Sequence, residues 1–177
     1  MTPAVGFRLW RIEEMLTGPR LASPYRHSVW VPHVALEAEC REEAGNGLPK
    51  AHRQASRMAP LSDCSCGIYA YHEAERMLDG IADGLVGGAV LCWGRVVIHN
   101  EGLRAQFARP LALAATEPIF VETHDRNVRR LAAAYGVPLL TDSHLGLYAR
   151  EFGESVKPPI EASSGWFERL LVRWFRD

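Results

Sequence analysis

The cysteines are the residues of this sequence whose spacing best suits metal chemistry. Cys64 and Cys66 are separated by one residue, and Cys40 lies upstream of them. A disulfide between residues two apart is strained, whereas two thiolates bind one metal ion readily, and a structural zinc ion takes four Cys or His ligands. We therefore expect zinc as a cofactor, with the ligands Cys40, Cys64, Cys66 and His52. Cys92 and His72 are alternatives for the fourth position.

A metal ion at this position would close a long loop. Residues 41–62 contain two glycines, two prolines and many charged residues, but little periodic apolar sequence. A structureless loop of this length is unusual in a compact domain, and a metal clip at its ends removes conformational entropy from the unfolded chain. The alternative interpretation is that Cys40 and Cys92 are small core residues, with Cys64 and Cys66 a chance pair at a turn.

A second group of candidate residues lies in a β-rich region. Residues 89–115 contain two β-rich runs around Asn100-Glu101-Gly102, a composition typical of a hairpin. Arginine and histidine alternate there with aromatic residues, which suits a phosphate, a carboxylate or single-stranded nucleic acid. The candidate ligand-binding residues are Trp93, Arg95, His99 and Arg104. The alternative is a solvated sheet face whose arginines pair with the many carboxylates of the chain.

The register of this hairpin stays open at the level of sequence. A three-residue loop places His99 opposite Leu103, and Gly102 then has the best turn position. A two-residue Glu101-Gly102 turn places His99 opposite Arg104 and sorts the faces better. In that register the apolar face contains Val96, Ile98, Leu103, Ala105 and Phe107, and the polar face contains Arg95, His99, Arg104 and Gln106.

The pattern of the whole chain predicts an α+β fold with an antiparallel or mixed sheet built around the central hairpin 89–115. Helical periodicity and capping residues predict helices at 73–83, 124–135 and 143–152. Residues 1–153 then form a single domain. Residues 154–165 are a linker, and residues 166–177 form a C-terminal amphipathic helix.

The C-terminal segment Trp166–Arg176 is a candidate for partner binding or self-association. Its aromatic and leucine residues form one broad apolar stripe, with Arg and Glu on the other side. Such a helix folds back on its own domain, docks in the groove of a partner or of a second copy, or makes peripheral contact with an anionic membrane surface.

Composition excludes several classes of protein. The chain has 177 residues, 47% of them hydrophobic, and a net charge of −1, which indicates one globular domain and argues against a general nucleic-acid binder. No apolar run is long enough to span a bilayer, and the first residues lack the apolar core of a signal peptide. We therefore expect a cytoplasmic protein, in which stable disulfides are rare.

Two classes of function fit these observations. The first is a small binding or scaffolding module that presents an arginine and aromatic sheet face and a C-terminal helix to a partner. The second is a small metal- or His-dependent hydrolase or transferase that acts on an anionic substrate. Glu122, His124 and Asp125 could serve it as acid–base groups, although a helix cap is the simpler explanation. The sequence contains none of the common catalytic motifs, which favours the binding module.

Zinc content tests the metal hypothesis directly. Protein purified without chelator should contain about one zinc ion per chain by elemental analysis, and Cys66→Ser should lower the melting temperature because metal binding contributes to folding. A zinc content far below one per chain would contradict the site.

Overall fold

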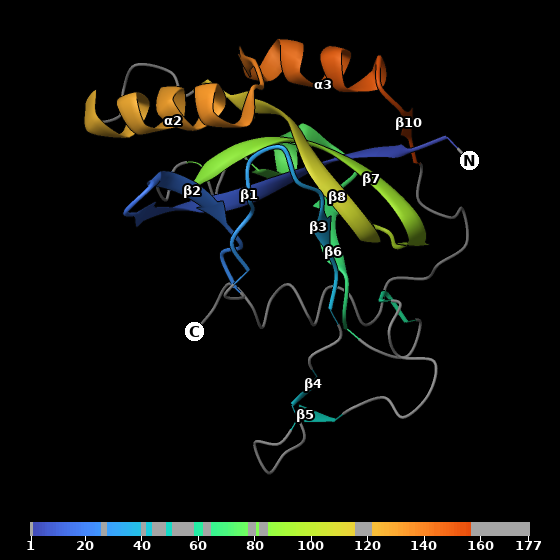
Figure 1. Ribbon diagram of the computed structural model, residues 1–177. Coiled ribbons are helices and arrows are strands. Elements are labelled where there is room, and N and C mark those ends of the chain that lie inside the picture. The colour runs from blue at the N-terminus through green and yellow to red at the C-terminus, as the bar shows by residue number, and fades with distance from the viewer. Residues whose placement is uncertain are drawn as a thin grey trace.

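The computed structural model describes residues 2–25, 28–39, 42–43, 49–50, 59–61, 65–77, 81, 85–115 and 122–156. These residues form one large sheet, a separate pair of short strands and two α-helices, which confirms the predicted α+β class (Figure 1). The strands are β1 (Ala4–Met15), β2 (Gly18–Ala22), β3 (Leu36–Glu37), β4 (Glu42–Glu43), β5 (Pro49–Lys50), β6 (Ile68–Tyr71), β7 (Val86–Ile98), β8 (Gly102–Ala114), β9 (Leu139–Leu140) and β10 (Glu154–Ser155). The helices are a 3-10 turn η1 (Ala74–Met77), α2 (Glu122–Tyr135) and α3 (Asp142–Arg150).

Four strands of the large sheet pair in a closed circuit. β1 pairs antiparallel with β7, β7 with β8, β8 with β6, and β6 returns to β1 where Phe7 lies opposite Tyr71. We call these four strands the strand ring. Because a ring has an inside and an outside, alternate residues of each strand point into two different environments.

Two apolar clusters occupy these environments. The first contains residues from all four strands of the strand ring and therefore fills its interior: Ala4, Trp10, Ile68, Ala70, Val90, Cys92, Leu103 and Ala105. The second contains the alternate residues of β1 and β7, namely Val5, Phe7, Leu9, Ala89 and Leu91. Helix α2 contributes Leu131 and Tyr135 to the first cluster, and α3 contributes Leu145 and Ala149 to the second. Figure 1 shows the two helices along the same side of the sheet.

The closure of the strand ring depends on a glycine at a point of close approach. A Cβ atom added to Gly6 would lie 2.7 Å from the Cβ atom of Ala70 and 3.1 Å from the carbonyl oxygen of Tyr71. Real Cβ atoms do not approach another side chain so closely, so any larger residue at this position must push β6 away from β1.

The observed register of β7 and β8 differs from both registers that the sequence left open. Val97 lies opposite Arg104 and Ile98 opposite Leu103, and the N–H of His99 donates to the carbonyl of Gly102 at 2.8 Å. Asn100 and Glu101 therefore form the turn. Further along, Gly94 and Arg95 together lie opposite Gln106 in a β-bulge, in which Gly94 has a φ of 77°. The bulge adds a residue to one strand only, which a simple alternation cannot reveal.

The face assignment changes accordingly. Val96, Leu103 and Ala105 pack with the first cluster as expected, but Ile98 is 41% exposed. Phe107 stacks on Trp93, which packs against the second cluster. Arg104, expected on a polar face, is buried.

The remaining predicted segments are described in part. The structure has η1 within the predicted helix 73–83, and α2 and α3 cover the predicted helices 124–135 and 143–152 to within a few residues. β4 and β5 pair with each other within the predicted loop 41–62. β10 pairs parallel with β1 at the start of the predicted linker, and residues 157–177, with the predicted C-terminal helix, lie outside the described residues. No helix in the described ranges is long and apolar enough to cross a membrane.

Two glycine substitutions test the closure. Gly6→Ala should lower the free energy of unfolding by roughly 1–3 kcal/mol, because the added methyl group overpacks the contact with β6. Gly146→Ala is the matched control, since nothing lies within 4 Å of a Cβ atom at this position inside α3. It should raise stability by about 0.5–1 kcal/mol. Equal effects in urea denaturation would show that the close contact at Gly6 is unimportant.

Candidate functional site

A charged side chain lies inside the strand ring. The alternation of β1 places Gly6, Arg8 and Trp10 on the interior face, and Arg8 is only 9% exposed. Its Nη2 atom donates a hydrogen bond to the Oγ atom of Ser23 at 3.2 Å. A guanidinium ion in this position is unusual, because burial removes the water that stabilises its charge.

Two indole rings flank the Arg8 guanidinium. Its Cζ atom lies 4.9 Å from the ring centroid of Trp30 and 5.6 Å from that of Trp10. The two rings meet edge to face, with centroids 5.5 Å apart and an interplanar angle of 88°. Both tryptophans are fully buried. The cation therefore faces aromatic rings, which attract it through their quadrupoles.

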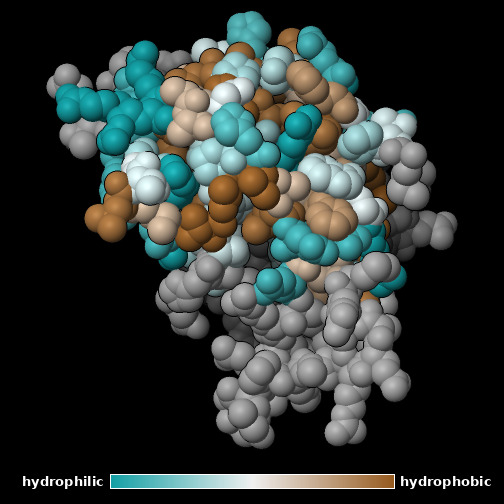
Figure 2. Space-filling model, viewed as in Figure 1, coloured by the Kyte–Doolittle hydropathy of each residue, from teal (hydrophilic) through white to brown (hydrophobic). Residues whose placement is uncertain are grey.

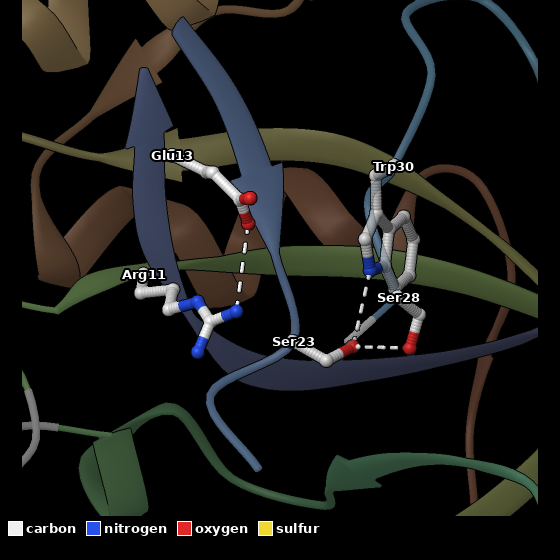
Figure 3. A network of polar contacts seen from close by, with 5 residues as sticks. All are labelled: Arg11, Glu13, Ser23, Ser28 and Trp30. Carbon is white, nitrogen blue, oxygen red and sulfur yellow. Dashed lines mark hydrogen bonds and ion pairs between the residues drawn. The ribbon is translucent and has the colours of Figure 1, made fainter. Parts of the chain in front are cut away.

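Ser23 is the polar centre of the site. Besides Arg8, it accepts a hydrogen bond from the hydroxyl of Ser28 at 3.3 Å and a long one from Trp30 Nε1 at 3.5 Å, as Figure 3 shows. Figure 3 also shows the ion pair of Arg11 and Glu13, further along β1. Trp10, Ser23 and Trp30 contact the guanidinium, and Ser28 bonds to Ser23. Together with Arg8 we call these residues the Arg8 cage: Arg8, Trp10, Ser23, Ser28 and Trp30.

The wall of the Arg8 cage is fixed by backbone hydrogen bonds and by one tyrosine. The N–H of Trp30 donates to Leu21 at 2.8 Å, and the N–H of Ser23 donates to Ser28 at 2.9 Å. From α2, the hydroxyl of Tyr135 donates to the carbonyl of Trp30 and accepts from the N–H of Leu21 at 3.0 Å. Helix α2 therefore holds Trp30 against Arg8, although Tyr135 and Trp30 lie far apart in the sequence.

The electrostatics of the Arg8 cage are unbalanced. Within the described part of the chain, no acidic side chain pairs with Arg8, and neither Arg8 Nε nor Trp10 Nε1 has a hydrogen-bond partner. Burial lowers the pKa of Arg8 to about 10, although Cys92 and Tyr71 act to raise it. The side chain thus remains a cation at neutral pH, with unused donors around it.

Two of the four predicted ligand-binding residues lie together on the outside of the strand ring. Arg104 Nε donates to His99 Nε2 at 2.9 Å, and Arg104 Nη1 donates to the carbonyl of Cys66 at 3.1 Å. The Tyr69 ring covers the guanidinium at 5.9 Å. His72 Nε2 donates to the carbonyl of His99 at 2.7 Å. The structure therefore joins His99 and Arg104 in one partly buried polar network.

The other two predicted residues lie elsewhere. Arg95 is exposed in the β-bulge, where its N–H donates to the side chain of Gln106 at 3.3 Å. Trp93 stacks on Phe107, with ring centroids 5.9 Å apart. The four residues do not form one site.

Of the four predicted zinc ligands, Cys66 lies within the described residues. Its Sγ atom accepts the N–H of Leu61 at 3.3 Å, and the residue is buried. Cys40, Cys64 and His52 lie outside the described residues. The described residues contain no group of three or more His, Cys, Asp or Glu side chains that could hold a metal ion. Of the alternative ligands, Cys92 is buried inside the strand ring, where burial raises its pKa to about 12.

Of the candidate acid–base residues at the start of α2, the structure describes the side chain of Asp125. Asp125 forms an ion pair with Arg129 at 2.9 Å, one turn further along the helix. The side chains of Glu122 and His124 lie outside the described part.

Sequence reasoning missed Arg8 because the alternation of the first strand points to a solvent-exposed arginine. Gly6, Arg8 and Trp10 occupy one face of the first strand, and Phe7 and Leu9 the other. An alternating strand with arginine on one face normally indicates a solvent face. The closed ring buries both faces, so the arginine becomes an interior residue.

Comparison of the chain with protein-family models, with curated proteins and with solved structures finds no match.

His99 allows a test of the outer network by pH. Burial, followed by the charge of Arg104 and His72, lowers the pKa of His99 from 6.5 to about 4. The unfolded chain then binds more protons than the folded one between these values, so the contribution of neutral His99 is complete above pH 6.5 and is lost as the pH falls toward 4.

His99→Gln removes this titration, because an amide oxygen accepts the N–H of Arg104 without binding a proton. Urea denaturation across that pH window should show a smaller loss of stability in the variant. The difference should be on the order of 1 kcal/mol, because solvent screens a half-exposed group. Identical losses in the two proteins would contradict the role of His99.

Proposed function

We propose that this protein is a small binding module that takes up an anionic ligand at the Arg8 cage. One observation carries the proposal: Arg8 is a buried cation for which the described residues supply no counter-charge. Such a group is costly to keep inside a fold, and it becomes favourable once an anion pairs with it.

The energies support this conclusion. An unpaired charge in a protein interior costs several kcal/mol after relaxation. The contacts with Trp10 and Trp30 return roughly 0.5–2 kcal/mol each, and the hydrogen bond to Ser23 returns about 1.5–3 kcal/mol. These terms only offset the cost, and they leave two donors unused. A site that gives up stability in this way is typical of functional residues.

The remaining groups of the Arg8 cage favour binding over chemistry. A general base needs a pKa near the operating pH, whereas guanidinium and indole groups are donors only. The nearby Cys92 thiol stays protonated, because burial raises its pKa to about 12. A hydrolase or transferase, the alternative from the sequence, therefore finds less support in this site.

The predicted protein partner remains a separate proposal. On the face shown in Figure 2, apolar and polar side chains are interspersed, which does not single out a docking surface there. The C-terminal segment that would bind a partner lies outside the described residues. The predicted zinc site at Cys66 is a separate proposal, which the zinc content of the purified protein tests.

Arg8→Met tests the proposal through the sign of its effect. A methionine fills much of the same space without charge. The free energy of unfolding of the ligand-free variant should therefore be at least that of the wild type, with a gain of roughly 1 kcal/mol or more. It should also lose any stabilisation by added anions, which for a ligand at 100 times its Kd amounts to about 2.7 kcal/mol. Thermal denaturation with acetate, phosphate and sulfate measures both effects.

Arg11→Met is the matched control. Arg11 lies on the same strand with its side chain 37% exposed and paired with Glu13, so its replacement should change stability by less than about 0.5 kcal/mol and leave anion effects intact. A loss of about 3 kcal/mol in Arg8→Met would instead show that Arg8 is a structural residue.

A further inference from the structure

We propose that the ligand of the Arg8 cage is a monocarboxylate, held with its carboxylate group against the Arg8 guanidinium. This inference rests on the proposed function and narrows it to one class of anion. Three features of the Arg8 cage lead to it: its charge, its unused donors and the shape of the guanidinium.

The charge of the cage matches a monoanion. The groups that act electrostatically on Arg8 are Cys92 and Tyr71. Both are neutral at pH 7, since burial raises the pKa of each. A second basic side chain does not accompany Arg8 in the part of the chain that the structure describes. A carboxylate would neutralise the single cation, whereas a phosphate dianion would bring a second charge into a buried site without compensation.

The unused groups are all donors. Arg8 Nε and Trp10 Nε1 each carry one hydrogen and have no partner. Neither can act as an acceptor. The hydroxyl oxygen of Ser23 already accepts from Arg8 and Ser28, which uses its two lone pairs. A ligand that satisfies this set must present acceptors, and a carboxylate presents two oxygens.

The shape of the guanidinium favours a planar partner. Arg8 Nη2 donates to Ser23, and the Nε atom of the same guanidinium has no partner. Two parallel N–H groups match the two oxygens of a carboxylate. The indole rings of Trp10 and Trp30 lie against the guanidinium and surround the group with apolar surface.

Exposure indicates the direction from which the ligand enters. Trp10 and Trp30 are completely buried, whereas Arg8 is 9% and Ser23 is 7% exposed. The neighbouring Ser28 is half-buried and Tyr25 is 51% exposed. The carboxylate would therefore enter beside Ser23 and Ser28, with the remainder of the ligand toward Tyr25.

The test uses the full chain at neutral pH and constant ionic strength. Sodium propionate, sodium benzoate, inorganic phosphate and sulfate are titrated separately, with intrinsic tryptophan fluorescence and melting temperature as readouts. Two of the five tryptophans of the chain belong to the Arg8 cage. The proteins are wild type, Arg8→Met, Arg8→Lys and the control Arg11→Met.

We expect the carboxylates to give a saturable fluorescence change and a rise in melting temperature in wild type and Arg11→Met. Arg8→Lys should bind about tenfold more weakly, since a lysine keeps the charge but loses the planar pair of donors. Arg8→Met should not bind. Phosphate and sulfate should have no saturable effect at the same concentrations.

The outcomes separate the two proposals. Arg8-dependent binding of phosphate or sulfate without binding of carboxylates would overturn the carboxylate class but leave the anion-binding function intact. Carboxylate binding of equal strength in wild type and Arg8→Met would place the ligand elsewhere and overturn both. Binding of none of the four anions would also overturn both, with a buried water as the partner of the unused donors.

Discussion

The closure of β6 onto β1 is the constraint on which the rest of the structure depends. The two strands meet where Phe7 lies opposite Tyr71, and the absent side chain of Gly6 allows this approach to Ala70. Closure turns one sheet into a ring with a narrow interior, which small residues such as Ala70, Cys92 and Ala105 fill. Strands β1, β7 and β8 are then buried on at least part of both faces, and the ordinary division into core face and solvent face no longer holds for them.

This constraint explains the two arginines that lie out of water. Arg8 is on the inside of the ring and Arg104 is on the outside, and both are almost completely buried. They are stabilised in different ways. Arg104 donates to His99 and to the carbonyl of Cys66, as expected of a structural network. Arg8 rests against two indole rings and one serine. Arg104 thus lies in a network of hydrogen bonds, whereas Arg8 lies mainly against aromatic rings, and this difference makes Arg8 the candidate binding residue.

The helices contribute to the site indirectly. Helix α2 ends at Tyr135, followed by Gly136 with a φ of 63°, a typical helix end. The Tyr135 hydroxyl at this end bonds to Trp30 and Leu21 and so fixes the wall of the Arg8 cage. A local signal in the sequence, the position at which a helix stops, thus determines a long-range contact around the candidate ligand site.

The sequence alone determined what depends on neighbouring residues. Helical periodicity and capping residues located α2, two β-rich runs located the strands β7 and β8, and the pattern of the whole chain indicated the α+β class. The sequence also singled out His99 and Arg104 as candidate ligand-binding residues, because arginine and histidine in a β-rich run are visible without a fold, and the structure joins the two by a hydrogen bond. Tertiary structure decided the register of β7 and β8, both at the turn Asn100-Glu101 and at the bulge beyond it. It also decided that Arg8 is an interior residue. The physical reason is that burial is a property of the assembled fold, in which Ser23 and Trp30, both beyond the end of β1, lie against the face that alternation alone would assign to solvent.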